Sequence, residues 1–282
     1  MASVTATNWR QGHKTRLKLA FCLYKYFPYG GLQRDFLRIA RECQKLGHDI
    51  RVYTLSWRGQ EPDGFDITIV PVKALTNHTR YERFNTWVQE TLIRDPVDAV
   101  IGINKMPGLD IYYAADSCYE EKARSQRSWL YRQLPRYRHF SRYEHAVFGR
   151  DSKTEILMIS HAQKSFFEHY YDTQAERIGF LSPGISRSRI APKDVLKRRK
   201  KMREILGIDH GEKMLVMIGS GFVKKGLSRA LFGVWSLSRQ QKRKTRFVVI
   251  GEDNQRPFRR LAWFLGISSR VTFMSGRDDI DR

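Results

Sequence analysis

The fold is decided by one stretch near the N-terminus, residues 17–55, which reads LKLAFCLYKYFPYGGLQRDFLRIARECQKLGHDIRVYTL. Its first seven residues are mostly apolar and run toward a pair of glycines, as a strand entering a turn does. Apolar side chains then recur at helical spacing, at Phe36, Ile39, Ala40, Cys43 and Leu46. Residues 50–55 predict the next strand. The stretch therefore predicts a βαβ unit and a parallel sheet.

The same alternation continues along the chain. Further strands are predicted at 67–72, 98–103 and 155–160. A second series follows, with strands at 213–220, 246–252 and 271–277 and helices at 226–240 and 259–267. We therefore expect an α/β protein with two Rossmann-like halves in succession. The basic segment 186–203 is interpreted as the linker region between them.

Composition restricts the partners of the chain. Its 282 residues carry a formal net charge of +22, which favours polyanions such as nucleic acid, an anionic membrane or phosphorylated substrates. No stretch approaches the roughly 18 uncharged apolar residues of a membrane span. Three scattered cysteines indicate a reduced, cytoplasmic protein rather than a disulfide framework. Residues 1–16 are polar and basic, so a disordered extension is expected.

Gly30 and Gly31 lie between the first predicted strand and its helix, and two explanations stay open. Glycine permits positive φ and a close approach of the backbone to a ligand, and the N-terminus of a helix favours an anion. A plain turn explains the pair equally well. Because the GxGxxG spacing is absent, a nicotinamide nucleotide is disfavoured.

A second glycine-rich turn, GSGFVKKG at 219–226, follows a predicted strand and precedes a helix. Its small residues allow close approach, and Lys224 and Lys225 can supply positive charge to a diphosphate. The segment is not a P-loop, because the GK[ST] ending is missing. Lysines that are merely solvated on the surface are the competing explanation.

Residues 104–123 follow the predicted strand 98–103 and form a candidate site loop, because ligands of such folds bind where parallel strands end. Four carboxylates in it are candidates for the acceptor side of a site: Asp110, Asp116, Glu120 and Glu121. Each is more commonly a structural or solvated group. The eight histidines show no metal-ligand spacing.

The segment 119–148 combines seven Lys and Arg with three Glu and seven aromatic residues. A helical projection puts Leu130, Leu134, Tyr137, Phe140 and Val147 on one side and Arg132, Arg136, Arg138 and Arg142 on the other. A basic amphipathic helix with aromatic anchors suits an anionic membrane surface, and a core-packed helix with a solvated basic face is the alternative. Pro135 predicts a kink or two shorter helices. No nucleic-acid-binding motif is present, so nucleic acid is not expected as a partner.

Taken together, KLAFCLYKYFPYGGLQRDFLRIA, INKMPGLDIYYAADSCYEEKA, RYRHF, DSKTEILMIS, SPGI at 182–185 and the turn containing KKG resemble the lipopolysaccharide core glucosyltransferases. These belong to the retaining GT-B glycosyltransferases of family 4. The resemblance covers residues 17–282. It implies a GT-B fold whose two Rossmann-like domains, 17–185 and 186–282, face a cleft, with the second domain incomplete.

The resemblance also implies an activity. The chain would move glucose from UDP-glucose onto a heptose of the lipopolysaccharide inner core through an α-1,3 linkage with retention. No metal or cofactor would be needed. The enzyme would work as a peripheral protein on the cytoplasmic face of the inner membrane, and 119–148 would be its membrane-interacting region.

Several positions match residues with known roles in that family. Gly30 and Gly31 match the loop that approaches the donor diphosphate, and Asp35 matches an acidic residue of the same loop and helix. Lys225 matches the basic residue that stabilises the leaving diphosphate. Lys224 stands where relatives more often carry arginine, so a bidentate contact is lost but the charge is kept.

Four further positions match less closely. Arg189 corresponds to an arginine near the phosphates, and Gly276 and Arg277 resemble the turn that receives the uracil. Asp116 is the candidate contact to an acceptor or sugar hydroxyl. The family's E-x(7)-E motif would fall after Arg282, so weakened donor binding is expected. The alternative function is therefore a catalytically impaired remnant that binds membrane or acceptor only.

Overall fold

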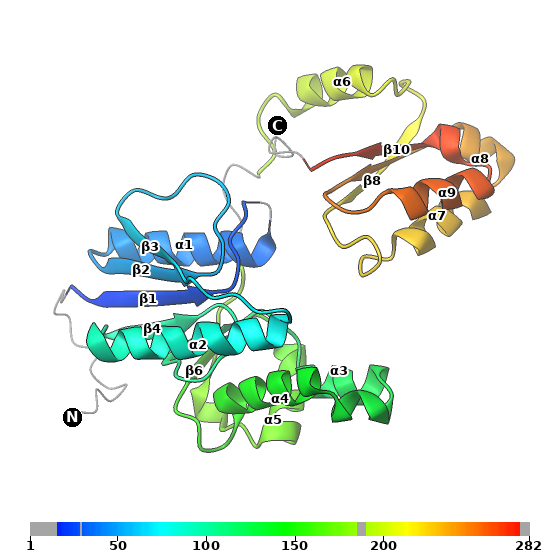
Figure 1. Cartoon of the computed structure of the whole chain (residues 1–282). Helices are drawn as coiled ribbons and strands as arrows, with labels where there is room; N and C mark the ends of the chain where they lie inside the picture. The colour runs from blue at the N-terminus through cyan, green and yellow to red at the C-terminus, as the bar shows by residue number, and fades with distance from the viewer. Residues whose placement is uncertain (1–15, 29, 185–189, 277–282) are drawn as a thin grey trace. The chain divides into compact units, whose positions relative to one another are not determined.

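A computed structural model describes residues 16–28, 30–184 and 190–276 (Figure 1). The chain divides into two compact units, Met1–Gly184 and Ile185–Arg282. Each unit is built on a parallel sheet, as the βαβ pattern predicts. The two units are described separately below.

The first unit contains a seven-stranded sheet in the order β3-β2-β1-β4-β5-β6-β7, and every neighbouring pair is parallel. The strands are β1 Lys18–Leu23, β2 Asp49–Thr54, β3 Phe65–Ile69, β4 Ala99–Gly102, β5 Ile111–Ala114, β6 Glu155–Met158 and β7 Ile178–Phe180. The chain builds outward from β1 to β3 and then returns to β4 on the other side of β1. The strand order therefore reverses between β1 and β4, where ligands of such sheets bind.

Helices cover both faces of this sheet (Figure 1). Phe36 and Ala40 of α1 pack with one apolar cluster, and Phe84, Phe148 and Phe167 of α2, α4 and α5 pack with the other. A parallel sheet must be covered on both sides, since its strands are apolar on both. The helices are α1 Gly31–Lys45, α2 Asn77–Arg94, α3 Tyr119–Gln126, α4 Pro135–Phe148 and α5 Lys164–Tyr171, with 3₁₀ turns at Trp129–Gln133, His161–Gln163 and Ala175–Arg177.

The sequence prediction places several strand ends too late. The strand predicted at 67–72 is β3 at 65–69, because Pro71 has no N–H for a ladder. The strand predicted at 155–160 ends at Met158. Strand β5 lies inside the stretch 104–123, which the sequence predicts as a loop, so the loop prediction was wrong for residues 111–114.

The segment 119–148 is interrupted, as Pro135 predicts. Helix α3 ends at Gln126, a 3₁₀ turn covers Trp129–Gln133, and α4 begins at Pro135 itself. Proline fits the first turn of a helix because that N–H has no partner within the helix. The single apolar stripe predicted across the segment was wrong: Leu130 and Leu134 are exposed, whereas Val147 is fully buried.

The second unit holds a three-stranded parallel sheet in the order β10-β9-β8. Its strands are β8 Lys213–Ile218, β9 Thr245–Ile250 and β10 Val271–Met274, and its helices are α6 Val195–Ile205, α7 Leu227–Ser236, α8 Arg239–Arg243 and α9 Arg256–Phe264. Phe222, Leu231 and Phe258 form its core with Phe247 and Val249 of β9. β9 is largely buried, whereas Leu215, Val216 and Ile218 of β8 are exposed.

Two elements of this unit differ from the prediction. The helix predicted at 226–240 ends at Ser236, because Ser238 and Gln241 form a reciprocal capping box that starts α8. The linker predicted at 186–203 includes the start of α6, and Arg203 is buried there, where it donates to the carbonyl oxygens of Asp209 and Glu212. The linker interpretation was therefore wrong from Val195 onward.

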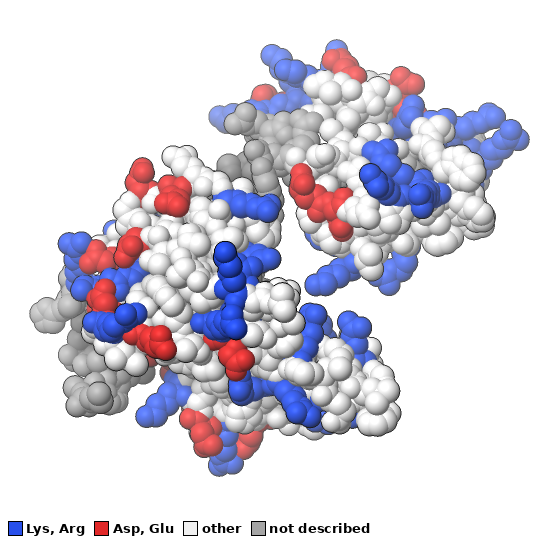
Figure 2. Space-filling view, in the orientation of Figure 1, with Lys and Arg blue, Asp and Glu red and all other residues white. Residues whose placement is uncertain are grey.

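Lys and Arg side chains are spread over both units, with Asp and Glu between them (Figure 2). Several acidic groups are paired, as in Arg51 with Asp95 at 2.7 Å and Arg150 with Asp172 at 2.8 Å. Exposed pairs of this kind contribute little to stability. The basic excess therefore acts mainly on partners and solubility.

His139 on α4 is a buried polar group of the first unit. Both ring nitrogens lack a hydrogen-bond partner among the described residues, and the ring packs on Tyr143 with centroids 4.0 Å apart. Glu82 and His78 of α2 and Arg142 of α4 are the charged or titratable groups near it. Burial lowers the pKa of His139 from its ordinary value of 6.5 to about 4.

This predicts acid-sensitive packing between α2 and α4. Below its unfolded pKa, the unfolded state binds a proton that folded His139 does not. The free energy of unfolding should therefore fall as the pH drops from about 6.5 toward 4. His139→Phe should make this fall shallower, because the phenyl ring takes no proton. Urea unfolding at pH 7.5, 5.5 and 4.5 measures the difference, and identical pH slopes for both proteins would contradict it.

Candidate functional site

The turn after β1 brings Gly30 and Gly31 to the edge of the sheet beside the strand reversal. Gly30 precedes α1 with φ −79° and ψ 137°, so positive φ is not what requires glycine here. A Cβ atom on Gly30 would instead overlap the end of the Gln33 side chain and lie 2.9 Å from the Phe27 ring. Around Gly31, the first residue of α1, a Cβ would meet no atom within 4 Å. Gly30 thus allows tight packing, and Gly31 leaves open space at the helix N-terminus.

Asp35 lies one turn into α1. It accepts a hydrogen bond from the Tyr113 hydroxyl at 3.2 Å, and Arg38 lies 3.9 Å from its other oxygen. Burial, and then the neighbouring Asp35 charge, raises the pKa of Tyr113 to about 12. Asp35 therefore links α1 to β5, and its predicted donor contact stays a prediction.

In the second unit, the turn between β8 and α7 depends on glycine conformations. Gly219, Gly221 and Gly226 have φ of 127°, 79° and 75°, a region that other residues rarely adopt. Lys225 folds back over this turn and donates to the carbonyl oxygen of Ile218 at 3.2 Å. Lys224 is exposed. The turn thus presents two lysines at the start of a ten-residue helix.

Asp253, just after β9, holds this turn in place. Its carboxylate accepts the backbone N–H of Phe222 at 2.7 Å and that of Asn254 at 2.8 Å. The Phe222 N–H, followed by that of Asn254, keeps the pKa of Asp253 below its usual value. The sequence analysis missed this residue. An acidic side chain directly after a predicted strand, in GED at 251–253, was the signal available for it.

The ends of β9 and β10 approach the same turn. A Cβ on Gly251 would lie 2.6 Å from the Gly219 carbonyl oxygen, and one on Gly276 would lie 2.8 Å from Glu252 Cγ. The Gly276 N–H donates to Glu252 at 3.2 Å. The three strand ends therefore meet at one edge. Arg189 and Arg277, both predicted near the donor, lie outside the described residues.

The four candidate carboxylates of the first unit differ in their hydrogen-bond partners and exposure. Asp110 accepts the Val100 N–H at 2.7 Å, Glu120 accepts the Tyr137 hydroxyl at 2.8 Å, and Glu121 accepts the Tyr170 hydroxyl at 2.7 Å. These three have structural partners. Asp116 is exposed on the turn after β5, which makes it the best placed of the four for a ligand.

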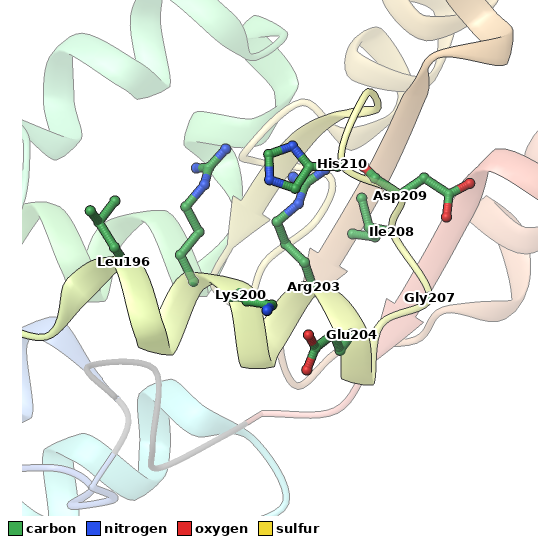
Figure 3. Close-up of a pocket in the computed structure, with 9 residues that line it drawn as sticks. Leu196, Lys200, Arg203, Glu204, Gly207, Ile208, Asp209 and His210 are labelled. Atoms are coloured by element: carbon green, nitrogen blue, oxygen red, sulfur yellow. Dashed lines mark hydrogen bonds between the residues drawn. The ribbon is translucent and has the colours of Figure 1, made fainter.

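A cavity of about 650 Å³ lies elsewhere, between α6 and the loop that leads into β8 (Figure 3). Leu196, Lys200, Arg203 and His210 are among the residues that line it. It lies at the amino end of β8, opposite the glycine turn at its carboxyl end. Arg203 is engaged by backbone carbonyl oxygens, so we assign this cavity to helix packing rather than to a donor site.

Residues 198–282 match the family model described as glycosyl transferases group 1. The lipopolysaccharide glucosyltransferase WaaG of Escherichia coli (strain K12) is 44% identical over 262 residues, which are 93% of this chain and 70% of that protein. The crystal structure of WaaG, a glycosyltransferase involved in lipopolysaccharide biosynthesis, superimposes with a TM-score of 0.89 at 43% identity, covering 93% of this chain and 71% of that one. The chain belongs to this glycosyltransferase family.

The GT-B fold expected from the sequence is confirmed by that similarity. A more distant structure, Anabaena Alr3699/HepE in complex with UDP-glucose, has a TM-score of 0.66 at 14% identity, covers 94% of this chain and 71% of that one, and supports the fold alone. In the described part of the glycosyltransferase, no three His, Cys, Asp or Glu side chains gather as a metal site. None of its described helices is long and apolar enough to cross a membrane.

The two glycines of the first turn predict opposite effects on stability. Gly30→Ala should lower the free energy of unfolding by about 1–3 kcal/mol, because the new methyl group overlaps the Gln33 side chain and the Phe27 ring. Gly31→Ala should leave it unchanged or raise it by up to about 1 kcal/mol, since alanine is the better helix residue. Urea unfolding of both variants is the measurement. An equal change in the free energy of unfolding in the two variants would contradict this prediction.

Proposed function

We propose that the chain transfers glucose from UDP-glucose to a heptose of the lipopolysaccharide inner core, with an α-1,3 linkage and retention of configuration. The observation that carries this is the 44% identity to WaaG over 93% of the chain. The name of that protein, a lipopolysaccharide glucosyltransferase, supplies the sugar and the acceptor class. UDP-glucose is bound as a substrate, and the proposal includes no metal or cofactor.

The chemistry of the leaving group supports the proposal. UDP gains negative charge as the bond to the sugar breaks, so positive groups aimed at the diphosphate stabilise the transition state more than the ground state. Lys225 and the N-terminus of α7 supply such charge. Asp116 is proposed to contact a sugar or acceptor hydroxyl, and the turn at Gly30 and Gly31 to approach the diphosphate.

A transfer assay with UDP-glucose and heptosylated acceptor tests this function. Lys225→Ala should lower kcat about 100-fold, because it removes a charge that acts on the departing diphosphate. Lys244→Ala is the matched control, since Lys244 is exposed at the amino end of β9. NMR of the product should show the α anomer.

The outcomes separate the candidate functions. Transfer by the wild-type chain with a selective loss in Lys225→Ala supports the proposal. No transfer from any of the UDP-sugars tested, together with intact vesicle binding, would instead favour the alternative, a protein that binds membrane or acceptor only. Faster turnover of UDP-galactose or UDP-N-acetylglucosamine would replace the donor sugar in the proposal.

We further propose that the segment around the 3₁₀ turn Trp129–Gln133 binds the anionic cytoplasmic face of the inner membrane. Three large apolar side chains are exposed together there: Trp129 at 64%, Leu130 at 59% and Leu134 at 48%. Arg132, Arg136 and Arg138 lie beside them in the sequence, and the last two are exposed. Arg142 is less suited to lipid, because it pairs with Glu82 at 2.5 Å.

Replacing Trp129, Leu130 and Leu134 together with serine should weaken binding to vesicles containing anionic lipid at least about tenfold, because their apolar area no longer enters the bilayer. Cosedimentation with such vesicles measures this. Leu75→Ser with Ile93→Ser is the matched control, since both side chains are also exposed on the first unit. Unchanged binding of the triple variant, or tighter binding to random DNA than to vesicles, would contradict the membrane proposal.

A further inference from the structure

Glu144 of α4 is a completely buried carboxylate at the carboxyl edge of the first sheet. It accepts the backbone N–H of Tyr119 at 2.8 Å, that of Glu120 at 2.9 Å and the hydroxyl of Tyr171 at 2.7 Å. The first two donors are the opening N–H groups of α3, which have no acceptor within their own helix. Glu144 therefore fixes the point at which the turn after β5 becomes a helix.

Lys105 neutralises this carboxylate from the other side of the turn. It lies in the loop after β4, its side chain is 12% exposed, and its ammonium group forms an ion pair with Glu144. The same ammonium donates to the carbonyl oxygen of Ser117 at 3.2 Å. The rings of Phe148 and Phe167 lie 5.7 and 5.5 Å from it. Lys105 thus ties the loop after β4 to the turn after β5.

Side chains from other elements therefore form hydrogen bonds with the backbone of four successive residues of the turn at 115–120. Lys105 donates to the Ser117 carbonyl oxygen, and Gln163 accepts the Cys118 N–H at 2.9 Å. Glu144 accepts the next two N–H groups. Asp116 is the exposed residue of this turn. Its carboxylate is therefore carried by a backbone that buried polar contacts keep in one geometry.

A buried ion pair is a poor device for stability alone, because the loss of hydration offsets most of the attraction, and apolar replacements are often neutral. We propose that Glu144 and Lys105 are positioning residues for glycosyl transfer, which together hold the turn that carries Asp116. This inference rests on the proposed function, in which Asp116 contacts a sugar or acceptor hydroxyl. The two side chains do not contact the substrates themselves in this proposal and act on them only by holding that turn.

The test uses Lys105→Met, Glu144→Gln and the variant with both changes in the full chain. Lys105→Met alone leaves a buried charge without its partner and should lower Tm strongly. The double variant removes both charges and should regain most of that Tm. A positioning role predicts that its kcat nevertheless stays at least about tenfold below wild type, because displaced reacting groups lose rate steeply. Its KM for UDP-glucose should be unchanged.

Thr154→Val is the matched control for stability. Thr154 is buried at the amino end of β6, opposite this edge, and its hydroxyl donates to the Leu109 carbonyl oxygen at 2.8 Å. The variant should lose Tm without losing kcat. If the double variant does not regain Tm, Glu144→Gln is assayed well below its own Tm, and the same loss of kcat is required of it.

A cycle with Asp116→Asn gives a readout that a merely structural pair would not move. Asp116→Asn should slow transfer in the wild-type background and have little further effect in the double variant, since the carboxylate there is already misplaced. Full recovery of kcat with Tm in the double variant, or additive losses in the cycle, would overturn the inference. A wild-type chain without transfer activity would overturn the proposed function instead. Hydrogen exchange of the Tyr119 and Glu120 amides would then test the structural role of the pair separately. If these amides exchange no faster in the double variant than in wild type, Glu144 and Lys105 do not hold the turn.

Discussion

Parallel strand pairing is the constraint on which the rest of the structure depends. Every neighbouring pair in both sheets is parallel, so each crossover must run back along a face and the carboxyl ends of the strands collect at one edge. In the first unit this edge gathers the turn after β1 and the segments 103–106 and 115–118. In the second it gathers the turns at 219–226, 251–253 and 275–276. The residues proposed to contact the donor or acceptor that the structure describes lie in these turns or one helical turn beyond: Gly30, Gly31, Asp35, Asp116, Lys224, Lys225 and Gly276.

The turns at such an edge contain backbone N–H groups that the sheet does not satisfy, and carboxylate side chains accept some of them here. Buried Glu144 accepts the first N–H groups of α3, and Asp253 accepts the Phe222 N–H. Unsatisfied buried polar groups are costly. These contacts therefore fix the turns, and through them the geometry of the edge.

The sequence predicted the βαβ pattern, the order of the two units and the glycine turns, because apolar periodicity and glycine placement are local signals. It did not predict that β5 is a strand, since Pro107, Gly108 and Asp110 just before it are typical of loops. The residue pattern did not distinguish Asp116 from Glu120, and only the family resemblance favoured Asp116, because the Tyr137 hydroxyl that bonds to Glu120 comes from another helix. Glu144 and Asp253 escaped notice for the same reason: their partners are distant in the chain.

Hydrogen exchange of the backbone amides with and without UDP tests the central proposal most directly, namely that the glycine turn between β8 and α7 binds the donor diphosphate. The account predicts that saturating UDP slows exchange at residues 220–224, where the glycine turn leads into the N-terminus of α7. Slowed exchange confined to other residues, such as those around the cavity beside α6, would contradict it.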